Sequence, residues 1–352
     1  MVVKIPPRFR INLKGDKKLS RNNLIITIVV IAVVIVGAFF FMNQGEEQQQ
    51  AEKFKAGMVT DVGGLGDQSF NDAAWRGLER AKKELGVEIN VIESGNMSDY
   101  VPNLNSLAEQ DYDIVWAIGF LMHDALKEVA EKNPDTKFGL IDSTVDLNNV
   151  ASVTFKEHEG SFLAGVVAAL KSETDKVGFI GGMETPLIQK FEAGYRAGVK
   201  AVKPDAKIFI GYTGAFDDPQ AGKELAFTQF NQGADVVYHA SGACGIGVIK
   251  AAKEEGLYAI GVDSPQNSLA PEHVLTSMVK RIDNAVYKIV KEHYDGNFKA
   301  GHTTYGLAED GVGIYREQAK KMLSEEILNT VDEYKQKIID GEIEVPKSPD
   351  QL

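Results

Sequence analysis

The sequence predicts an α/β protein with two doubly wound parallel-sheet lobes and a hinge, preceded by one transmembrane helix. Three observations lead to this prediction. A long apolar run lies near the N-terminus, from residue 24 to residue 41. From Phe54 onward, short apolar segments alternate with amphipathic ones, which is typical of parallel strands joined by covering helices. The strands are too many for one sheet of comfortable size, and cores of this extent tend to divide, so we expect two lobes.

The first part of the chain is predicted to be a membrane anchor. Residues 1–22 carry seven basic side chains against one acidic residue, Asp16. The apolar run that follows is interrupted only by Thr27, and about 20 apolar residues suffice to cross a bilayer. Because basic residues favour the cytoplasmic side, we expect a cytoplasmic segment at 1–22 and a single-pass anchor in the cell membrane at 23–42. A polar stalk at 43–53 would then lead to an extracytoplasmic domain.

A cleaved signal peptide is the alternative interpretation of this segment. Its apolar region would be about 7–15 residues long and would end at small residues. Here the run is longer and ends in Phe39-Phe40-Phe41-Met42. The only cysteine, Cys244, lies far downstream, so neither a lipid-modified N-terminus nor a disulfide is expected. We therefore favour an uncleaved anchor.

Charge and composition exclude several functional classes. The net charge is −12, and because residues 1–22 contribute +6, the remainder carries −18. A body this acidic repels nucleic acid, so no nucleic-acid partner is expected. The histidines are scattered without the spacing of metal ligands, so we expect neither a metal nor another cofactor.

The predicted elements follow in chain order. Lobe 1 is expected at 54–155, with strands at 55–60, 88–93, 113–118, 137–141 and 151–155 and helices at 72–85 and 122–131. Lobe 2 is expected at 156–277, with strands at 176–180, 207–212, 235–239, 258–262 and 274–277 and helices at 157–170, 188–201, 219–232 and 246–255. A helix at 279–294 returns the chain to lobe 1, which is completed by about 278–315. Residues 316–352 are expected to form a charged C-terminal helix and tail.

The segment that runs from Asp61 to Asn71 is the most informative part of the sequence. It follows the first strand and opens a helix, and ligands of open α/β sheets bind at loops of this kind. Its glycines permit a close backbone approach to a ligand, and Asp67 or Ser69 can cap the helix. A ring beside an amide, Phe70 and Asn71, suits a nucleobase. A glycine-rich turn with a helix cap is the purely structural alternative.

Later strands also end in glycine or polar residues, namely Gly119, Asp142, the loop 242–247 that begins at Gly242, and Asp263. A carboxylate such as Asp263 can accept two hydroxyl hydrogens, as from a ribose diol, although an Asx-turn before Pro265 would also explain it. The same two interpretations apply to Asp142. The loop 242–247 has GxxGxG spacing, which is not the dinucleotide fingerprint. Taken alone, Lys280 is expected to be a solvated lysine.

Together these segments resemble the basic membrane protein (BMP) family, the PnrA-like purine-nucleoside receptors of ATP-binding-cassette (ABC) importers. The resemblance runs from Phe54 to about Pro346 and rests on motifs at 61–64 with 67–71, 159–165, 242–247, 261–264 and 276–281. It implies a type I periplasmic-binding-protein fold, with two lobes joined by three crossings of the chain. It also implies a purine nucleoside (guanosine, inosine or adenosine) as ligand, and the permease and ATPase subunits of a transporter as partners.

The resemblance assigns roles within the expected site. The residue that stacks on the base falls on Phe70, and the lysine near the sugar falls on Lys280. A second aromatic wall is expected, for which Tyr238 is the candidate. The polar residues that contact the base fall on Asn71 and Asp142 with Asp61 close by, and the acid that contacts ribose falls on Asp263.

Two departures from the family pattern leave other functions open. A predicted transmembrane helix replaces the family's lipid-anchoring cysteine, and Pro265 stands where a second acid is frequent. The anchor would also suit a membrane-tethered nucleoside sensor or regulator with the same fold. An enzyme such as a nucleoside hydrolase would need an acid–base constellation that the sequence does not supply, so we expect no catalytic activity.

Overall fold

The protein is described by a computed structural model that covers residues 25–26, 28–36 and 53–352. Residues 25–26 and 28–36 are helical, and the rest of the predicted anchor at 23–42, the segment 1–22 and nearly all of the stalk lie outside the described residues. Within the described ranges, no helix is both long enough and apolar enough to cross a membrane. Residues 53–352 form one compact unit.

Two six-stranded sheets form the centre of this unit. Strand order is β11-β5-β4-β3-β1-β2 in the first sheet and β12-β10-β9-β8-β6-β7 in the second. All pairs are parallel except β10 with β12. The first sheet contains β1 (Lys55–Thr60), β2 (Glu88–Ile92), β3 (Ile114–Ile118), β4 (Lys137–Ile141), β5 (Val150–Phe155) and β11 (Gly301–Tyr305). The second contains β6 (Lys176–Gly181), β7 (Lys207–Tyr212), β8 (Val236–Ala240), β9 (Tyr258–Asp263), β10 (Val274–Lys280) and β12 (Val312–Ile314).

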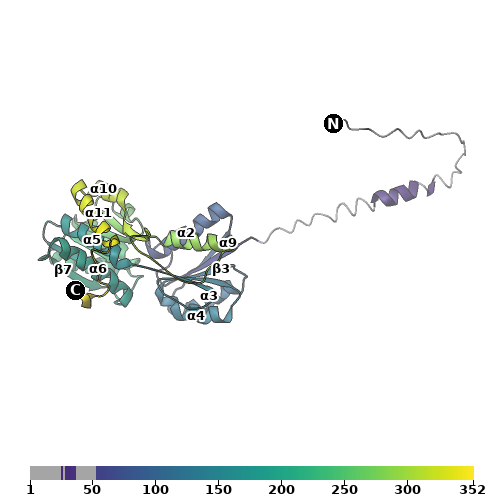
Figure 1. Ribbon diagram of the computed structural model, residues 1–352, viewed down its shortest axis with the longest axis horizontal. Helices are drawn as coiled ribbons and strands as arrows, with labels where there is room; N and C mark the ends of the chain where they lie inside the picture. The colour runs from purple at the N-terminus through teal and green to yellow at the C-terminus, as the bar shows by residue number, and fades with distance from the viewer. Residues whose placement is uncertain (1–24, 27, 37–52) are drawn as a thin grey trace, which may run out of the picture. The chain divides into compact units, whose positions relative to one another are not determined.

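Helices cover both faces of each sheet (Figure 1). Around the first sheet, α2 (Phe70–Leu85) packs beside α9 (Ile282–Tyr294), and α3 (Tyr100–Ala108) packs beside α4 (His123–Lys132). Around the second, α5 (Glu157–Lys171) packs against α6 (Pro186–Val202), and α7 (Pro219–Asn231) against α8 (Cys244–Glu255). The last helices, α10 (Arg316–Met322) and α11 (Glu325–Ile339), pack on β10 and α5. We call these two halves lobe 1 and lobe 2.

The central strands form because side chains on both of their faces are apolar, as expected for parallel strands covered by helices. In β1, Met58 belongs to the core beneath α2 and α9, whereas the next residue, Val59, belongs to the core beneath α3 and α4. This alternation places successive residues on opposite faces. The predicted two-lobe α/β fold with parallel sheets is therefore confirmed.

The chain crosses between the lobes at three places: Lys156, Arg281 and residues 306–311. The crossings are tied to one another, because the Lys156 N–H donates to the Tyr305 carbonyl at 2.9 Å and the Arg281 N–H donates to the Gly311 carbonyl at 2.8 Å. They therefore form one connected hinge.

Four elements differ from the sequence-based expectation. The strands β11 and β12 and the helix α3 were not predicted. The strand β11 is exposed and polar at the sheet edge, so it has no apolar alternation to detect, and β12 is only 3 residues long. The segment predicted as the start of a helix at 279 continues β10 to Lys280, so Lys280 belongs to the second sheet, as does β12.

Candidate functional site

A cavity that is partly open to solvent lies between the lobes at the carboxyl ends of the strands. In open α/β sheets, small-molecule sites occupy this edge. Lobe 1 contributes Asp61, Gly63, Asp67, Phe70, Asn71, Gly119, Phe120 and Asp142, and lobe 2 contributes Leu187, Ile188, Phe191, Phe216, Ala240, Gly242, Val262, Asp263 and Lys280. Eight of the nine residues expected at the ligand are thus brought together: Asp61, Phe70, Asn71, Gly119, Asp142, Gly242, Asp263 and Lys280.

Tyr238 is the exception, and its prediction as the second aromatic wall is wrong. Its side chain is fully buried inside lobe 2, where its hydroxyl lies 3.1 Å from Ser161 Oγ and its ring packs on Tyr195. It lies within β8 and does not line the cavity, whereas Ala240 at the end of that strand does. The rings that lobe 2 presents instead are Phe191 of α6 and Phe216 of the loop after β7. Phe216 could have been predicted from the sequence, because loops that follow parallel strands lie at the ligand-binding edge of the sheet.

The start of α2 is organised around Asp67. Its carboxylate accepts the backbone N–H groups of Ser69, Asn71 and Asp72 at 2.8–3.2 Å, so Asp67 caps the helix as predicted. The Asn71 side-chain amide donates to Asp61 Oδ1 at 2.8 Å and to Asp67 Oδ2 at 3.3 Å. Both of its N–H hydrogens are therefore used, and it offers the cavity only Oδ1, which is buried without a hydrogen-bond partner.

Burial governs the protonation of these carboxylates. Desolvation raises the pKa of Asp61 to about 6, although hydrogen bonds from Asn71 and Gly63 oppose it. Desolvation also raises the pKa of Asp67 to about 7, against the backbone N–H groups that it accepts. Both shifts reflect the cost of a charge removed from water.

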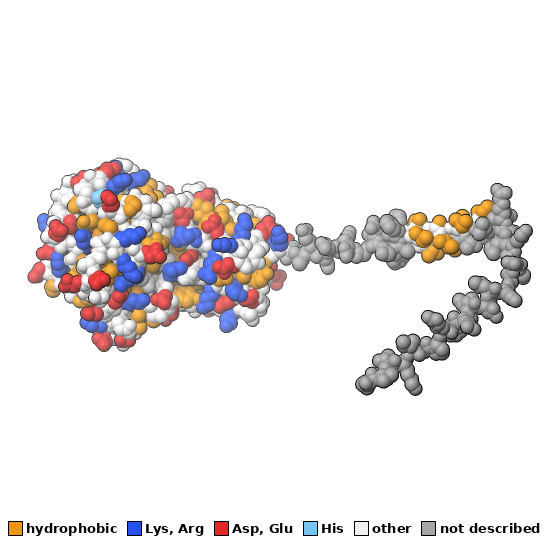
Figure 2. All heavy atoms as spheres, turned by 90° about the horizontal axis from the view of Figure 1, so that it is seen from above, with side chains coloured by type: hydrophobic (Ala, Val, Ile, Leu, Met, Phe, Trp, Pro, Cys, Tyr) orange, Lys and Arg blue, Asp and Glu red, His pale blue; other side chains and the backbone are white. Residues whose placement is uncertain are grey.

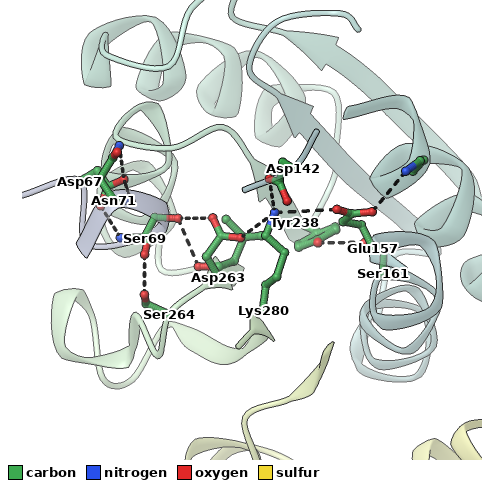
Figure 3. Close-up of polar contacts among 12 residues, drawn as sticks. Asp67, Ser69, Asn71, Asp142, Glu157, Ser161, Tyr238, Asp263, Ser264 and Lys280 are labelled. Atoms are coloured by element: carbon green, nitrogen blue, oxygen red, sulfur yellow. Dashed lines mark hydrogen bonds and ion pairs between the residues drawn. The ribbon is translucent and has the colours of Figure 1, made fainter. Parts of the chain in front are cut away.

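Lys280 lies at the centre of the cavity's charge network (Figure 3). Its Nζ lies 2.6 Å from Asp142 Oδ2 and 3.9 Å from both Asp263 Oδ1 and Glu157 Oε1. The side chain is only 2% exposed, so the interpretation as a solvated lysine is wrong. Burial alone would lower the pKa of Lys280, but the three carboxylates together raise it, so the lysine is charged.

Sequence reasoning missed Glu157, the first residue of α5. It is fully buried, neither carboxylate oxygen has a hydrogen-bond partner, and its nearest cations are Lys280 and Lys190, the latter at 3.7 Å. Desolvation raises the pKa of Glu157 to about 7, although Lys280 opposes it. Its position at a predicted helix start gave no sign of burial beside Lys280.

Aromatic rings surround the charged network. The Lys280 Nζ lies 4.9 Å from the centre of the Phe70 ring and 5.5 Å from that of Phe191. The rings of Phe120 and Phe216, from opposite lobes, meet edge to face at 6.3 Å. The site therefore combines flat apolar faces with a few fixed polar atoms, as small-molecule sites commonly do.

Two of the cavity carboxylates sit on unusual backbone. Asp142 and Asp263, each directly at the end of its strand, have φ values of 67° and 59°. Residues other than glycine adopt this left-handed region at a cost of about 1–3 kcal/mol, and such residues cluster at functional sites. The turn in each case directs a carboxylate from the sheet edge into the cavity.

The unsatisfied atoms of the cavity are all acceptors. Asn71 Oδ1, Asp142 Oδ1 and Asp263 Oδ1 are buried and accept no hydrogen bond. Buried acceptors of this kind are costly unless a donor reaches them. The arrangement suits a flat, uncharged molecule with several N–H or O–H donors. Among the described residues, no cluster of His, Cys, Asp or Glu is placed to hold a metal ion.

Comparisons with known proteins agree with this architecture. Residues 54–349 match the family model described as ABC transporter substrate-binding protein PnrA-like. The CD4+ T-cell-stimulating antigen of Listeria monocytogenes is 39% identical, over 85% of this chain and 90% of its own. The ABC transporter nucleoside-binding protein BmpA of Lactococcus lactis subsp. cremoris is also 39% identical, over 83% of this chain and 89% of its own.

A solved structure gives the same picture at the level of the fold. An ABC transporter solute-binding protein from Aeropyrum pernix K1 superimposes with a TM-score of 0.78 at 31% identity, covering 84% of this chain and 95% of that one. The match of the family model to nearly all of residues 53–352 agrees with the expected resemblance. The chain belongs to the PnrA-like (Bmp) family of ABC transporter substrate-binding proteins.

Proposed function

We propose that this protein captures purine nucleosides outside the cell for an ABC importer. The observation that carries the proposal is the set of buried acceptors between aromatic rings: Asn71 Oδ1, Asp142 Oδ1 and Asp263 Oδ1. A nucleoside supplies donors on its base and hydroxyls on its ribose. The name of the Lactococcus lactis relative, a nucleoside-binding protein, supports the same ligand class.

In this proposal, the purine stacks on Phe70, with Phe191 or Phe216 as the opposite wall. Stacking of a base on an aromatic ring contributes about 1–3 kcal/mol. The base edge donates to Asn71 Oδ1, with Asp61 beside it. The ribose hydroxyls donate to Asp263 Oδ1 and Asp142 Oδ1, and the Lys280 ammonium lies beside both carboxylates. A Cβ at Gly119 would lie 3.0 Å from Asp61 Oδ2 and one at Gly242 would lie 3.0 Å from the Phe216 carbonyl oxygen, so a side chain at either position would crowd residues that line the cavity.

The same charges would select nucleosides over nucleotides. Asp61, Asp142 and Asp263 line the cavity, whereas Lys280 is the one cation among the described residues that line it. A phosphate would meet like charge and would leave buried acceptors without donors. Calorimetric titration with guanosine, inosine, adenosine, ribose and guanosine monophosphate tests the proposal. We expect the nucleosides to bind most tightly. Tighter binding of ribose or of the nucleotide would contradict it.

We further propose that the apolar segment at 23–42 tethers the protein to the cell membrane, with 1–22 in the cytoplasm and the ligand-binding unit outside. The described part of this segment is helical, and its isoleucine and valine side chains are each more than half exposed (Figure 2). The permease and ATPase subunits of the importer would be its partners. Protease treatment of intact cells should remove residues 53–352 and leave the N-terminus protected.

A transport role, a sensor role and an enzymatic role make different predictions. Deletion of the gene should abolish nucleoside uptake if the protein serves an importer. Normal uptake with altered gene expression would instead indicate the tethered sensor. Nucleoside recovered intact after incubation with the protein would support the absence of hydrolase activity.

A further inference from the structure

Two serines, one from each lobe, form hydrogen bonds across the boundary between the lobes (Figure 3). Ser69 of lobe 1 donates its hydroxyl hydrogen to Asp263 Oδ2 of lobe 2 at 2.7 Å. Ser264 of lobe 2 donates its hydroxyl hydrogen to the Ser69 carbonyl at 2.6 Å. Arg76, two turns into α2, donates to Ser264 Oγ at 2.8 Å. Both serines are buried, with 0% and 3% of their surface exposed.

The hydroxyl of Ser69 is available because Asp67, and not Ser69, caps the N-terminus of α2. Ser69 occupies the N-cap position of α2, where a serine normally accepts a backbone N–H of the first turn. It makes no such bond, because the Asp67 carboxylate accepts those N–H groups instead. The cap by Asp67 therefore leaves Ser69 free to reach across to the other lobe.

Because of this contact, the two oxygens of the Asp263 carboxylate have different surroundings. Oδ2 is held by Ser69, whereas Oδ1 is buried without a hydrogen-bond partner and lies 3.9 Å from Lys280 Nζ. A carboxylate held by one oxygen can present the other in only one direction. The hydrogen bond from Ser69 to Asp263 can form only when the lobes are together. Closure of the lobes therefore fixes the orientation of Asp263 Oδ1.

We propose that Ser69, Arg76 and Ser264 form an interlobe latch of positioning residues, which aims Asp263 Oδ1 at a hydroxyl of the bound ligand. The inference rests on the proposed nucleoside function and assigns these three residues a task within it. The latch residues act on the ligand only through Asp263, and their removal should therefore weaken recognition of the sugar hydroxyls and spare recognition of the base.

Calorimetry with two ligands tests the latch. Guanosine carries the ribose hydroxyls and 2′,3′-dideoxyguanosine lacks both. We expect Ser69→Ala to bind guanosine roughly tenfold more weakly, as for a lost hydrogen bond to a charged group, and to bind the dideoxy analogue within about threefold of the wild type. The full chain in detergent is the material for both titrations.

Arg76→Ala provides a second variant that should not disturb folding, since Arg76 is exposed. Its matched control is Arg80→Ala, one turn further along α2, whose guanidinium contacts Glu84 and Asn284 and no residue of lobe 2. We expect Arg76→Ala to weaken guanosine binding selectively and Arg80→Ala to leave both ligands unchanged.

The outcomes separate the latch from the proposed function. Failure of the wild type to bind guanosine would refute the nucleoside function, and with it the role given to the latch. Normal binding by the wild type, with equal losses for both ligands in Ser69→Ala, would overturn the latch and leave the function standing. The latch would also be overturned if Arg76→Ala and Arg80→Ala behaved alike.

Discussion

At the scale of single residues, Lys280 decides the charge balance of the cavity. One buried ammonium faces the carboxylates of Asp142, Asp263 and Glu157. Burial is the largest effect on each group, yet the pKa of Lys280 rises while those of Glu157 and Asp263 rise as well. The directions agree physically: the attraction of three anions outweighs the burial of Lys280, whereas for Glu157 and Asp263 burial outweighs the attraction of the nearby cations. A buried charge without a partner would cost several kcal/mol.

The raised pKa of Glu157 predicts a pH dependence of stability. Its ordinary pKa of 4.5 is raised to about 7 by burial, so the folded state holds a proton more tightly than the unfolded state. The resulting stabilisation is fully present below about pH 4.5 and is lost as the pH rises through 7. We expect Glu157→Gln to reduce the fall in unfolding free energy between pH 5 and 8, as measured by urea denaturation.

Part of that slope should remain in Glu157→Gln, because the pKa values of Asp61 and Asp67 are raised to about 6 and 7. Glu173→Gln is the control, since Glu173 is exposed. Its pH profile should follow that of the wild type. A profile of Glu157→Gln that matches the wild type would show that Glu157 does not titrate in this range.

The ring of Phe70 is expected to stack on the base, and its removal should weaken binding. Replacing it by alanine removes a stacking face worth about 1–3 kcal/mol, so guanosine should bind about five-fold to a hundred-fold more weakly in a calorimetric titration. Phe298→Ala is the control, because that ring packs near His293 and does not line the cavity. Unchanged affinity in Phe70→Ala would remove Phe70 from the binding site.

At the scale of elements, α5 and α6 pack with unusually close backbones. A Cβ at Gly198 of α6 would overlap the carbonyl oxygen of Phe162 in α5, and one at Gly194 would overlap that of His158. Glycine is needed here for space, because neither helix can move away without opening the core of lobe 2. Since α5 begins at Glu157, next to the crossing at Lys156, this packing also fixes one side of the hinge.

Gly198→Ala should therefore destabilise lobe 2. Forcing an extra methyl group into a packed interface costs about 1–3 kcal/mol, which urea denaturation would detect as a lower midpoint. The matched control is Gly313→Ala in β12, where an added Cβ would meet no atom within 4 Å. Equal stabilities of the two variants would show that the helices can separate at little cost.

At the scale of the whole molecule, we expect the lobes to move as units about the connected hinge at Lys156, Arg281 and residues 306–311. The contacts that oppose opening include the latch, the Lys280–Asp142 pair and the edge-to-face rings of Phe120 and Phe216. A ligand that touches both lobes must add to these contacts only when the lobes are together. Binding should therefore favour the closed arrangement.

Ligand-linked closure can be measured directly. Spin labels at Glu131→Cys in α4 and Glu255→Cys in α8 lie on exposed positions of opposite lobes, and native Cys244 is buried. Guanosine should reduce both the mean distance between the labels and the width of the distance distribution. At one hundred times its Kd, guanosine should raise the free energy of unfolding by about 2.7 kcal/mol. Ribose at the same concentration serves as the control. A distribution that guanosine leaves unchanged would argue against closure.

The course of the chain was largely predictable from local patterns. Apolar strands such as β3 and β4 can be predicted from their composition. The loops that follow them contain Gly119 and Asp142, which both line the cavity. The exposed strand β11 escaped prediction because it buries little and so carries no apolar pattern. Tyr238 was wrongly predicted to line the cavity, because the sequence alone does not show which residues near the end of β8 reach it.

By itself, the sequence determined the two-lobe α/β class and the strand-end residues of the cavity, because both follow from periodicity and from the shared edge of parallel strands. Only the tertiary structure decided which of those residues meet. Lys280 and Asp142 are 138 positions apart, and Ser69 and Asp263 are 194 apart. Their contact depends on how two sheets come together across a hinge, and no local pattern encodes that distance. The burial that raises the pKa of Glu157 arises from the same packing.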